Sequence, residues 1–408
     1  MTARVLHLLS QRPLLTGSGV TLDALVRRGA RAGWGQEVVI GVPASERDVT
    51  VGGLGAERVR PLLLECGDLD FPVPGMSDVM PYGSTRFSEM TAGQLAAYRA
   101  AWLAHLRRVV KRFEPDVIHS HHAWIMSSLV KDVAPEIPVV CHCHATGLRQ
   151  MQLCPHLAEE VGAGCRRIER FIAQHERVSV ELEDSLRLDR RAIRLVVGGF
   201  DESIFNPVAC VPQPGPQLAY IGKYSAAKGL PWLLDAVERL EKRHTGLRLH
   251  VAGSGSGAQA DELRRRMQAM SPLLVLHGQL DQLTLAGLLR ECAVCVLPSF
   301  YEGVPLVLAE ARAAGCMLVA TRLPGITAAL APHLGDDLLL VEPPRLEAVD
   351  RPLEEDLPAF VDALVQAVDR ALERSKTVDR AAGCPGLSAL GWDAVFGRIE
   401  EIWRELLA

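Results

Sequence analysis

The sequence lacks the features that define several large protein classes. No apolar run approaches the roughly 20 residues of a membrane-spanning helix, so we expect no transmembrane segment, while peripheral contact with a membrane stays open. The 44 basic and 49 acidic residues give a net charge of −5, without the basic excess of a nucleic-acid-binding protein. Residues 1–9 lack a cleavage site and predict a first strand, not a signal peptide.

The cysteines lack the spacing of a disulfide or zinc framework. Ten are scattered without a repeating frame, which indicates reduced thiols in a cytoplasmic protein. Histidines and cysteines gather in residues 119–165. Cys141 and Cys143 could share one face of a strand, because they are two residues apart. His142 and His144 could share the other. Structural zinc sites, however, pair ligands about two to four residues apart across two knuckles. No such pair of pairs occurs, so polar groups at strand ends are favoured and no metal is predicted.

Length and composition indicate two globular α/β domains. The 408 residues are 48% hydrophobic and 23% charged, and such a length predicts two domains of about 200 residues. Residues 4–10 predict a strand, followed by a glycine loop at 16–20, a helix closed by Gly33 and a strand at 36–42. This unit opens a doubly wound sheet. The NAD-type fingerprint Gly-x-Gly-x-x-Gly is absent from this turn, because Leu22 occupies the position of its third glycine.

The alternation of strands and helices continues on both sides of a proline-rich segment. Residues 208–216 hold three prolines and a glycine, which is typical of an interdomain linker. Before it, we expect strands at 59–65, 115–122, 138–140, 176–180 and 193–197, and helices at 90–113 and 157–172. Beyond it, we expect strands at 218–221, 247–251, 275–278, 292–297 and 317–321, and helices at 306–314, 359–372 and 392–407.

The most informative stretch is Pro298-Ser-Phe-Tyr-Glu302-Gly-Val-Pro-Leu-Val-Leu-Ala-Glu310-Ala311. It follows a predicted buried strand and runs into a helix, where unpaired N–H groups and the helix dipole favour an anion. Glu302 and Glu310 flank that anion site. A nucleotide sugar, with phosphates in the middle and hydroxyls at both ends, suits such a site. An ordinary strand–turn–helix with two solvated glutamates is the alternative.

Lysines follow another strand end. Lys223 and Lys228 lie five residues apart in Gly222-Lys-Tyr-Ser-Ala-Ala-Lys-Gly229. Two lysines at this spacing beyond a strand can converge on a diphosphate as point charges. Two solvated surface lysines are the alternative, because lysine is mostly exposed.

The stretch from Pro298 to Ala311 resembles the Glu-x7-Glu signature of retaining glycosyltransferases of family 4. These have the GT-B architecture: an α/β fold with two Rossmann-like doubly wound domains facing a central cleft and a C-terminal helix crossing back to the first domain. The resemblance implies an acceptor-side domain of residues 1–207, completed by residues 388–408. It implies a nucleotide-sugar donor domain of residues 208–387.

The resemblance also implies roles for individual residues. Glu302 would contact the donor sugar, Glu310 the ribose hydroxyls and the intervening amides the diphosphate. His144, after its strand, would reach the donor sugar. Lys223 replaces the family's arginine, which keeps the charge and loses the bidentate fork. Glu302, His144 and Lys228 are therefore the expected catalytic residues. The expected donor-binding residues are Gly17, Gly19, Lys223, Lys228, Gly253, Gly278, Glu302, Gly303, Val304, Leu306, Val307 and Glu310.

On these grounds we predict a metal-independent retaining glycosyltransferase. It would move a hexose-type sugar from a nucleotide diphosphate donor, with UDP favoured, to an acceptor that the sequence does not identify. Lys223, Lys228 and the helix amides would stabilise the leaving diphosphate. No cofactor is expected beside the nucleotide sugar as substrate. A sugar-nucleotide epimerase or hydrolase of the same fold and a non-catalytic nucleotide-sugar-binding scaffold stay open as alternatives.

Overall fold

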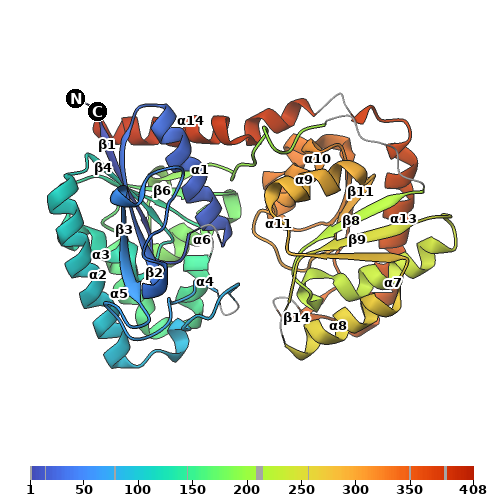
Figure 1. Cartoon of the computed structure of the whole chain (residues 1–408), viewed down its shortest axis with the longest axis horizontal. Coiled ribbons are helices and arrows are strands. Elements are labelled where there is room, and N and C mark those ends of the chain that lie inside the picture. The colour runs from blue at the N-terminus through green and yellow to red at the C-terminus, as the bar shows by residue number, and fades with distance from the viewer. Residues whose placement is uncertain are drawn as a thin grey trace. The chain divides into compact units, whose positions relative to one another are not determined.

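The chain folds into two compact units. The computed structural model describes residues 2–13, 15–77, 80–144, 146–207, 215–255, 257–348, 351–380 and 384–408. Unit 1 comprises residues 1–198 and 392–408, and unit 2 comprises residues 199–391 (Figure 1). The sequence predicts these boundaries at 207/208 and 387/388 instead. Most of the predicted linker, residues 208–214, lies outside the described residues.

Unit 1 is built on a parallel sheet of seven strands in the order β3-β2-β1-β4-β5-β6-β7. The strand order reverses between β1 and β4, so the carboxyl ends of these two strands form the switch point at which open α/β sheets bind ligands. The strands are β1 (Arg4–Leu9), β2 (Gly35–Pro43), β3 (Val59–Leu64), β4 (Val117–His121), β5 (Val139–His142), β6 (Arg170–Ala173) and β7 (Ile193–Leu195).

Helices cover both faces of this sheet, because alternate strand residues point to opposite sides. Leu6 and Ile118 pack in one core with α2, α3 and α5, whereas Val5 and Val117 pack on the other face with α1 and α14. The helices are α1 (Gly17–Arg31), α2 (Ala92–Phe113), α3 (Ile125–Val133), α4 (Thr146–Leu153), α5 (Pro155–Cys165), α6 (Glu176–Leu186) and α14 (Trp392–Leu407).

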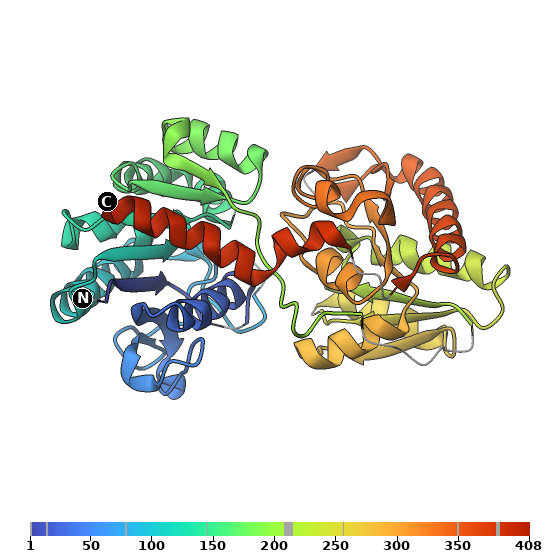
Figure 2. The same cartoon turned by 90° about the horizontal axis from the view of Figure 1, so that it is seen from above.

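The C-terminal helix α14 belongs to unit 1, as predicted. Figure 2 shows it lying along this unit beside α1. Its apolar stripe, Val395, Ile399, Ile402 and Trp403, is buried against the sheet. The last helix therefore completes the core that the first strand begins.

Unit 2 holds a second parallel sheet, in the order β10-β9-β8-β11-β12-β13, with its switch point between β8 and β11. Helices α7 and α13 pack on one face. The strands are β8 (Gln217–Ile221), β9 (Arg248–Ala252), β10 (Leu274–Gly278), β11 (Val294–Leu297), β12 (Met317–Thr321) and β13 (Leu338–Val341), with the small pair β14 (Leu346–Ala348) and β15 (Arg351–Pro352). The helices are α7 (Leu230–Glu241), α8 (Ala258–Ala269), α9 (Gln282–Glu291), α10 (Val307–Ala313), α11 (Pro324–Ala329), α12 (Ala331–Leu334) and α13 (Leu357–Ser375).

The predicted architecture of two doubly wound α/β domains is confirmed, but two predicted elements of unit 1 are wrong. The helix expected over 157–172 ends at Cys165, and Arg170–Ala173 forms strand β6. A short apolar run such as Phe-Ile-Ala suits a helix and a buried strand equally well by its periodicity. The strand expected over 176–180 is the start of helix α6, whose buried Val178, Leu182 and Leu186 recur every four residues.

Two features expected from composition can be checked against the described residues. No helix there combines the length and the apolar character needed to cross a membrane. No disulfide joins any of the nine cysteines in the described part of the chain.

Candidate functional site

The loops that follow β8 and β11 meet at the switch point of unit 2. The Phe300 N–H donates to the carbonyl oxygen of Ala227 at 2.9 Å. Gly229 lies so close to Pro298 that a Cβ atom would stand 2.0 Å from the Pro298 carbonyl oxygen, and its φ is +70°. Only glycine tolerates both conditions. The two loops are thereby held together at the carboxyl edge of the sheet.

This junction brings Lys228 and Glu302 together. Lys228 Nζ lies 2.6 Å from Glu302 Oε1, and Ser299 Oγ donates to the same oxygen at 2.8 Å. The side chains are only 24% and 14% exposed, so their attraction is screened less than that of a surface ion pair. The sequence predicts both residues in the site. It does not predict that one neutralises the other, nor that Ser299 takes part.

Lys223 reaches the same edge from the end of β8. Its side chain is exposed, while its backbone is fixed by Tyr220, whose hydroxyl donates to the Lys223 carbonyl oxygen at 2.7 Å. Tyr220 is buried in the core of unit 2, and burial raises the pKa of its hydroxyl well above the usual value. Tyr220 is not among the residues predicted from the sequence, although a buried tyrosine hydroxyl usually needs a partner.

The glycines predicted to bind the donor pack strand ends together. The Gly253 N–H donates to the Gly278 carbonyl oxygen at 2.7 Å. At Gly253, with φ +140°, a Cβ would stand 1.9 Å from the Gly222 carbonyl oxygen. A Cβ at Gly278, with φ +68°, would meet nothing within 4 Å. Gly253 is therefore required for close packing of β8 and β9, while space lies open beside Gly278.

The loop after Glu302 leads into a short helix. A Cβ at Gly303 would meet nothing within 4 Å. Val304 and Leu306 are half-buried, and Val307 begins α10, which has seven residues. Glu310 lies in the first turn of this helix, and burial raises the pKa of its carboxyl group to about 7.

In unit 1, the prediction of a glycine loop at residues 16–20 is wrong, because α1 begins at Gly17. Gly17 and Gly19 lie in the first turn of α1, which is capped by Thr16: its Oγ1 accepts from the Gly19 N–H at 3.2 Å. Gln11, just past β1, donates to Thr16 Oγ1 at 3.0 Å and to Ser18 Oγ at 2.7 Å. Because Thr16 is the N-cap, the helix begins at Gly17, inside the segment predicted as a loop. A Cβ at Gly17 would meet nothing within 4 Å.

His144 lies just beyond β5, in a group of histidines at the strand ends of unit 1. Its Nε2 is 2.9 Å from His121 Nδ1, and its ring lies nearly parallel to that of His142, with centroids 4.5 Å apart. Side-chain nitrogens of His119, His121 and His142 lie within 4.8 Å of one another and could hold a metal ion by distance alone. The sequence predicts polar groups here, but not their mutual packing.

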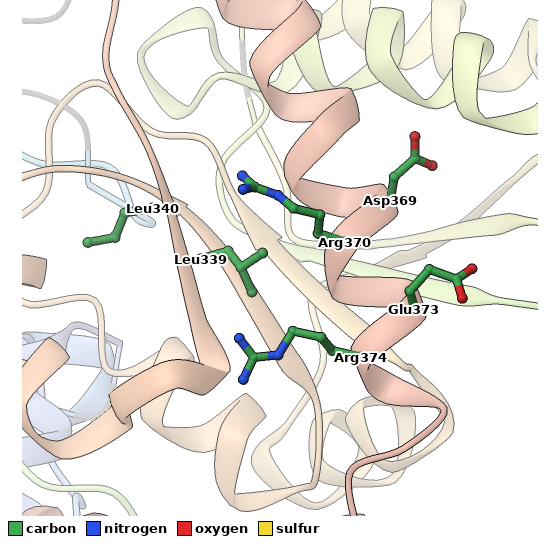
Figure 3. A pocket seen from close by; sticks show the side chains of 6 residues that line it. All are labelled: Leu339, Leu340, Asp369, Arg370, Glu373 and Arg374. Atoms are coloured by element: carbon green, nitrogen blue, oxygen red, sulfur yellow. The ribbon is translucent and has the colours of Figure 1, made fainter.

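A cavity of about 610 Å³ opens elsewhere in unit 2, beside β13 and α13. Figure 3 shows Arg370 and Arg374 directed toward Leu339, and Asp369 and Glu373 directed to the other side. Its lining residues are Leu339, Leu340, Asp369, Arg370, Glu373 and Arg374. None of them belongs to the loops after β8 or β11, so the cavity is separate from the Lys228–Glu302 junction.

Known proteins share both the sequence pattern and the fold. Residues 80–203 match the family model described as Glycosyltransferase Family 4, and residues 215–370 match that described as Glycosyl transferases group 1. Glycogen synthase of Mycobacterium tuberculosis is 29% identical over 261 residues, which are 60% of this chain. The match spans 62% of the length of that relative.

Solved structures resemble the chain over nearly its whole length. Sucrose-phosphate synthase from Thermosynechococcus elongatus aligns with a TM-score of 0.73, 18% identity and 99% coverage of both chains. Anabaena HepE, solved with UDP and glucose, aligns with a TM-score of 0.64 and 15% identity over 97% of this chain and 98% of that one. With both sheets, the Glu-x7-Glu stretch and the two family matches in place, this chain belongs to glycosyltransferase family 4 and has the GT-B architecture.

Proposed function

We propose that this chain is a retaining glycosyltransferase that moves a hexose-type sugar from a UDP-sugar to an acceptor. The observation that carries the proposal is the junction of Lys228 and Glu302 at the switch point of unit 2, in a chain of glycosyltransferase family 4. The choice of UDP is supported by HepE, which was solved with UDP and glucose. The acceptor is left open.

In the proposed reaction, the bond between the anomeric carbon and the diphosphate breaks and negative charge grows on the leaving phosphate. Lys228, helped by Lys223 and the amides of residues 303–307, stabilises that charge, which is usually the largest catalytic contribution. The acceptor oxygen bonds to the anomeric carbon on the face that the phosphate leaves. Its proton passes to the leaving phosphate, so no separate base is assigned.

Without a ligand, Glu302 is paired with Lys228, and we propose that donor binding frees Glu302 to contact the sugar. A diphosphate offers Lys228 more negative charge than one carboxylate does, so it can take over the ammonium group. Glu302 Oε1 then keeps only the Ser299 hydroxyl, which donates at 2.8 Å, and can accept from a sugar hydroxyl. The remaining assignments, Glu310 on the ribose and His144 on the donor sugar, rest on the resemblance to the family.

Metal independence is also part of the proposal. The chain contains one Asp-x-Asp, Asp68-Leu69-Asp70, the pattern with which the other major transferase architecture binds a metal. Here Asp68 accepts from the Leu63 N–H at 2.9 Å and closes a turn after β3, while Leu69 is buried in the core of unit 1. Both features give this motif a structural role. We further propose no cofactor, a cytoplasmic location and no nucleic-acid partner.

A thermal-shift panel tests the proposal directly. UDP, GDP, ADP and UDP-glucose are added separately to the full chain and to a Lys228→Ala variant, because a ligand that binds only the native state raises Tm. We expect UDP and UDP-glucose to stabilise the parent protein, and the variant much less. No shift with any nucleotide would refute the donor site. Consumption of UDP-glucose at the same rate with and without candidate acceptors would favour a hydrolase or epimerase instead.

A further inference from the structure

A stack of histidines lies on the face of the unit 1 sheet that α14 covers. His7 pairs with His119, and His121 with His142, on adjacent strands, and His144 follows β5. Neighbouring ring centroids in this group are 4.5 to 5.8 Å apart. Burial lowers the pKa of every ring in the group, that of His142 to about 4. At neutral pH, each ring therefore has one N–H and one lone pair.

Partners outside the stack determine which nitrogen carries the proton on two of these rings. An indole N–H can only donate, and Trp403 Nε1 donates to His119 Nδ1 at 3.0 Å, so the proton of His119 is on Nε2. The Gln36 Nε2 group donates to the Val26 carbonyl oxygen at 2.9 Å. Its Oε1 therefore faces His7 Nε2 at 3.0 Å as an acceptor, and the proton of His7 is on Nε2.

These tautomers argue against a metal at the three-histidine group. Metal binding needs a lone pair from each of His119, His121 and His142. The lone pair of His119 already accepts from Trp403, and its other nitrogen is protonated. A metal would have to break the bond from Trp403 before His119 could become a ligand.

The hydrogen bond between His121 and His144 contains one proton, which could come from either ring. His121 Nε2 is buried and, like the His119 Nε2 that the bond from Trp403 leaves protonated, has no partner among the described residues. A proton there would be an unpaired buried N–H, which is rarer in proteins than an unpaired acceptor. The ring of His119, which carries its proton on Nε2, is adjacent, with its centroid 5.0 Å from that of His121. This neighbouring proton further disfavours a proton on His121 Nε2. The proton of His121 therefore lies on Nδ1 and is donated to His144 Nε2.

We propose that His121 is a positioning residue that holds His144 in the tautomer protonated on Nδ1. Because Nε2 accepts from His121, Nδ1 carries the only N–H of the His144 ring and can donate to an oxygen atom of a ligand. The stacked ring of His142 restricts rotation of His144. The inference rests on the proposed function, in which the ligand is a nucleotide sugar and the oxygen belongs to the donor sugar.

Nitrogen-15 spectra of the full chain labelled at histidine distinguish the two tautomers without any assay of activity. We expect His144 to be protonated on Nδ1 and His119 on Nε2 at pH 7. A His144 ring protonated on Nε2 would overturn the proposal. So would stoichiometric binding of added Zn²⁺ with histidine ligands that include His119.

Two variants at position 121 test the coupling. In His121→Asn, the amide nitrogen can take the place of Nδ1 and still donate, whereas His121→Phe fills a similar volume and cannot. We expect His144 to keep its tautomer in the Asn variant and lose it in the Phe variant, with thermal melts to confirm that both fold. An unchanged His144 tautomer in the Phe variant would overturn the role of His121.

Binding of UDP and UDP-glucose, measured by calorimetry, links the tautomer to the ligand. We expect UDP-glucose affinity to fall about threefold to tenfold in the Phe variant, as for the loss of one neutral hydrogen bond, and to be kept in the Asn variant. UDP affinity should be the same in all three proteins. If neither ligand binds the parent protein, the proposed function fails, while the spectra still decide the tautomer. An equal loss for UDP and UDP-glucose would overturn the link to the sugar.

Discussion

Replacing Glu310 with glutamine should stabilise the protein at high pH and much less at low pH. Burial raises the pKa of this carboxyl group from 4.5 to about 7, so the folded state holds the proton more tightly than the unfolded chain. The resulting stability is fully present below about pH 4.5 and is lost as the pH rises through about 7. With about 1.4 kcal/mol per pKa unit, the buried carboxylate lowers the free energy of unfolding by at most about 3 kcal/mol at pH 8.

Denaturant melts of the parent protein and Glu310→Gln at pH 4.5 and pH 8 measure this difference. We expect the variant to be about 2 to 3 kcal/mol more stable at pH 8 and nearly equal at pH 4.5. Glu354→Gln, at an exposed position, controls for the loss of one negative charge. A stability difference that is the same at both pH values would refute the reasoning, because glutamine would then act through packing.

Because the pKa of Glu310 is raised to about 7, we also expect nucleotide binding to release protons. Ribose hydroxyls that donate to Glu310 would favour its charged form and so lower its pKa. At pH 6.5, UDP binding should then release protons, which calorimetry in buffers of different ionisation enthalpy detects. Glu310→Gln should remove that release.

Three further substitutions test the junction and the strand ends, and a fourth is the matched control for Gly253→Ala. Lys228→Ala should weaken UDP binding about tenfold to a hundredfold, as expected for a hydrogen bond to a charged group, and unchanged affinity in calorimetry would exclude Lys228 from the phosphate site. Glu302→Gln should keep UDP binding, because the lysine loses its competing carboxylate, while turnover falls; equal turnover would remove Glu302 from the reaction. Gly253→Ala should lower the free energy of unfolding by about 2 kcal/mol or more, because its Cβ would collide with the Gly222 carbonyl oxygen. Gly287→Ala, inside α9 with nothing within 4 Å of the new Cβ, should instead raise it by about 0.5 to 1 kcal/mol.

Elements with a long periodic pattern could be predicted from the sequence, whereas two short segments of unit 1 were assigned to the wrong kind of element. Helix α14 spans Trp392–Leu407, the range expected from its apolar stripe. Strand β6 has four residues, and helix α6 contains a Val-Ser-Val run at residues 178–180. Both runs are too short for periodicity to separate helix from strand. Threonine capping at Thr16 likewise moved the start of α1 into an expected loop.

In the candidate site, the positions of residues could be predicted from local sequence, but their contacts with residues far away in the chain could not. The strand-end positions of Lys228, Glu302 and His144 were predictable, because carboxyl ends of parallel strands lie along one edge. The ion pair of Lys228 with Glu302 joins residues 74 positions apart, and the bond from Trp403 to His119 joins residues 284 positions apart. No local pattern encodes which of many polar side chains will meet across such distances.

The place of α14 in unit 1 also bears on the order in which the chain can fold during synthesis. Unit 2, residues 199–391, precedes α14 in the chain, although unit 1 supplies the strand at Arg4–Leu9, so α14 is synthesised after both sheets. Until then, the sheet face formed by Val5, Val117, Val140 and Ile172 is covered by α1 but lacks α14, the second helix of its core. The first of the two units to be translated is therefore the last to be completed, and part of its apolar face stays open to chaperones or to aggregation while unit 2 is synthesised.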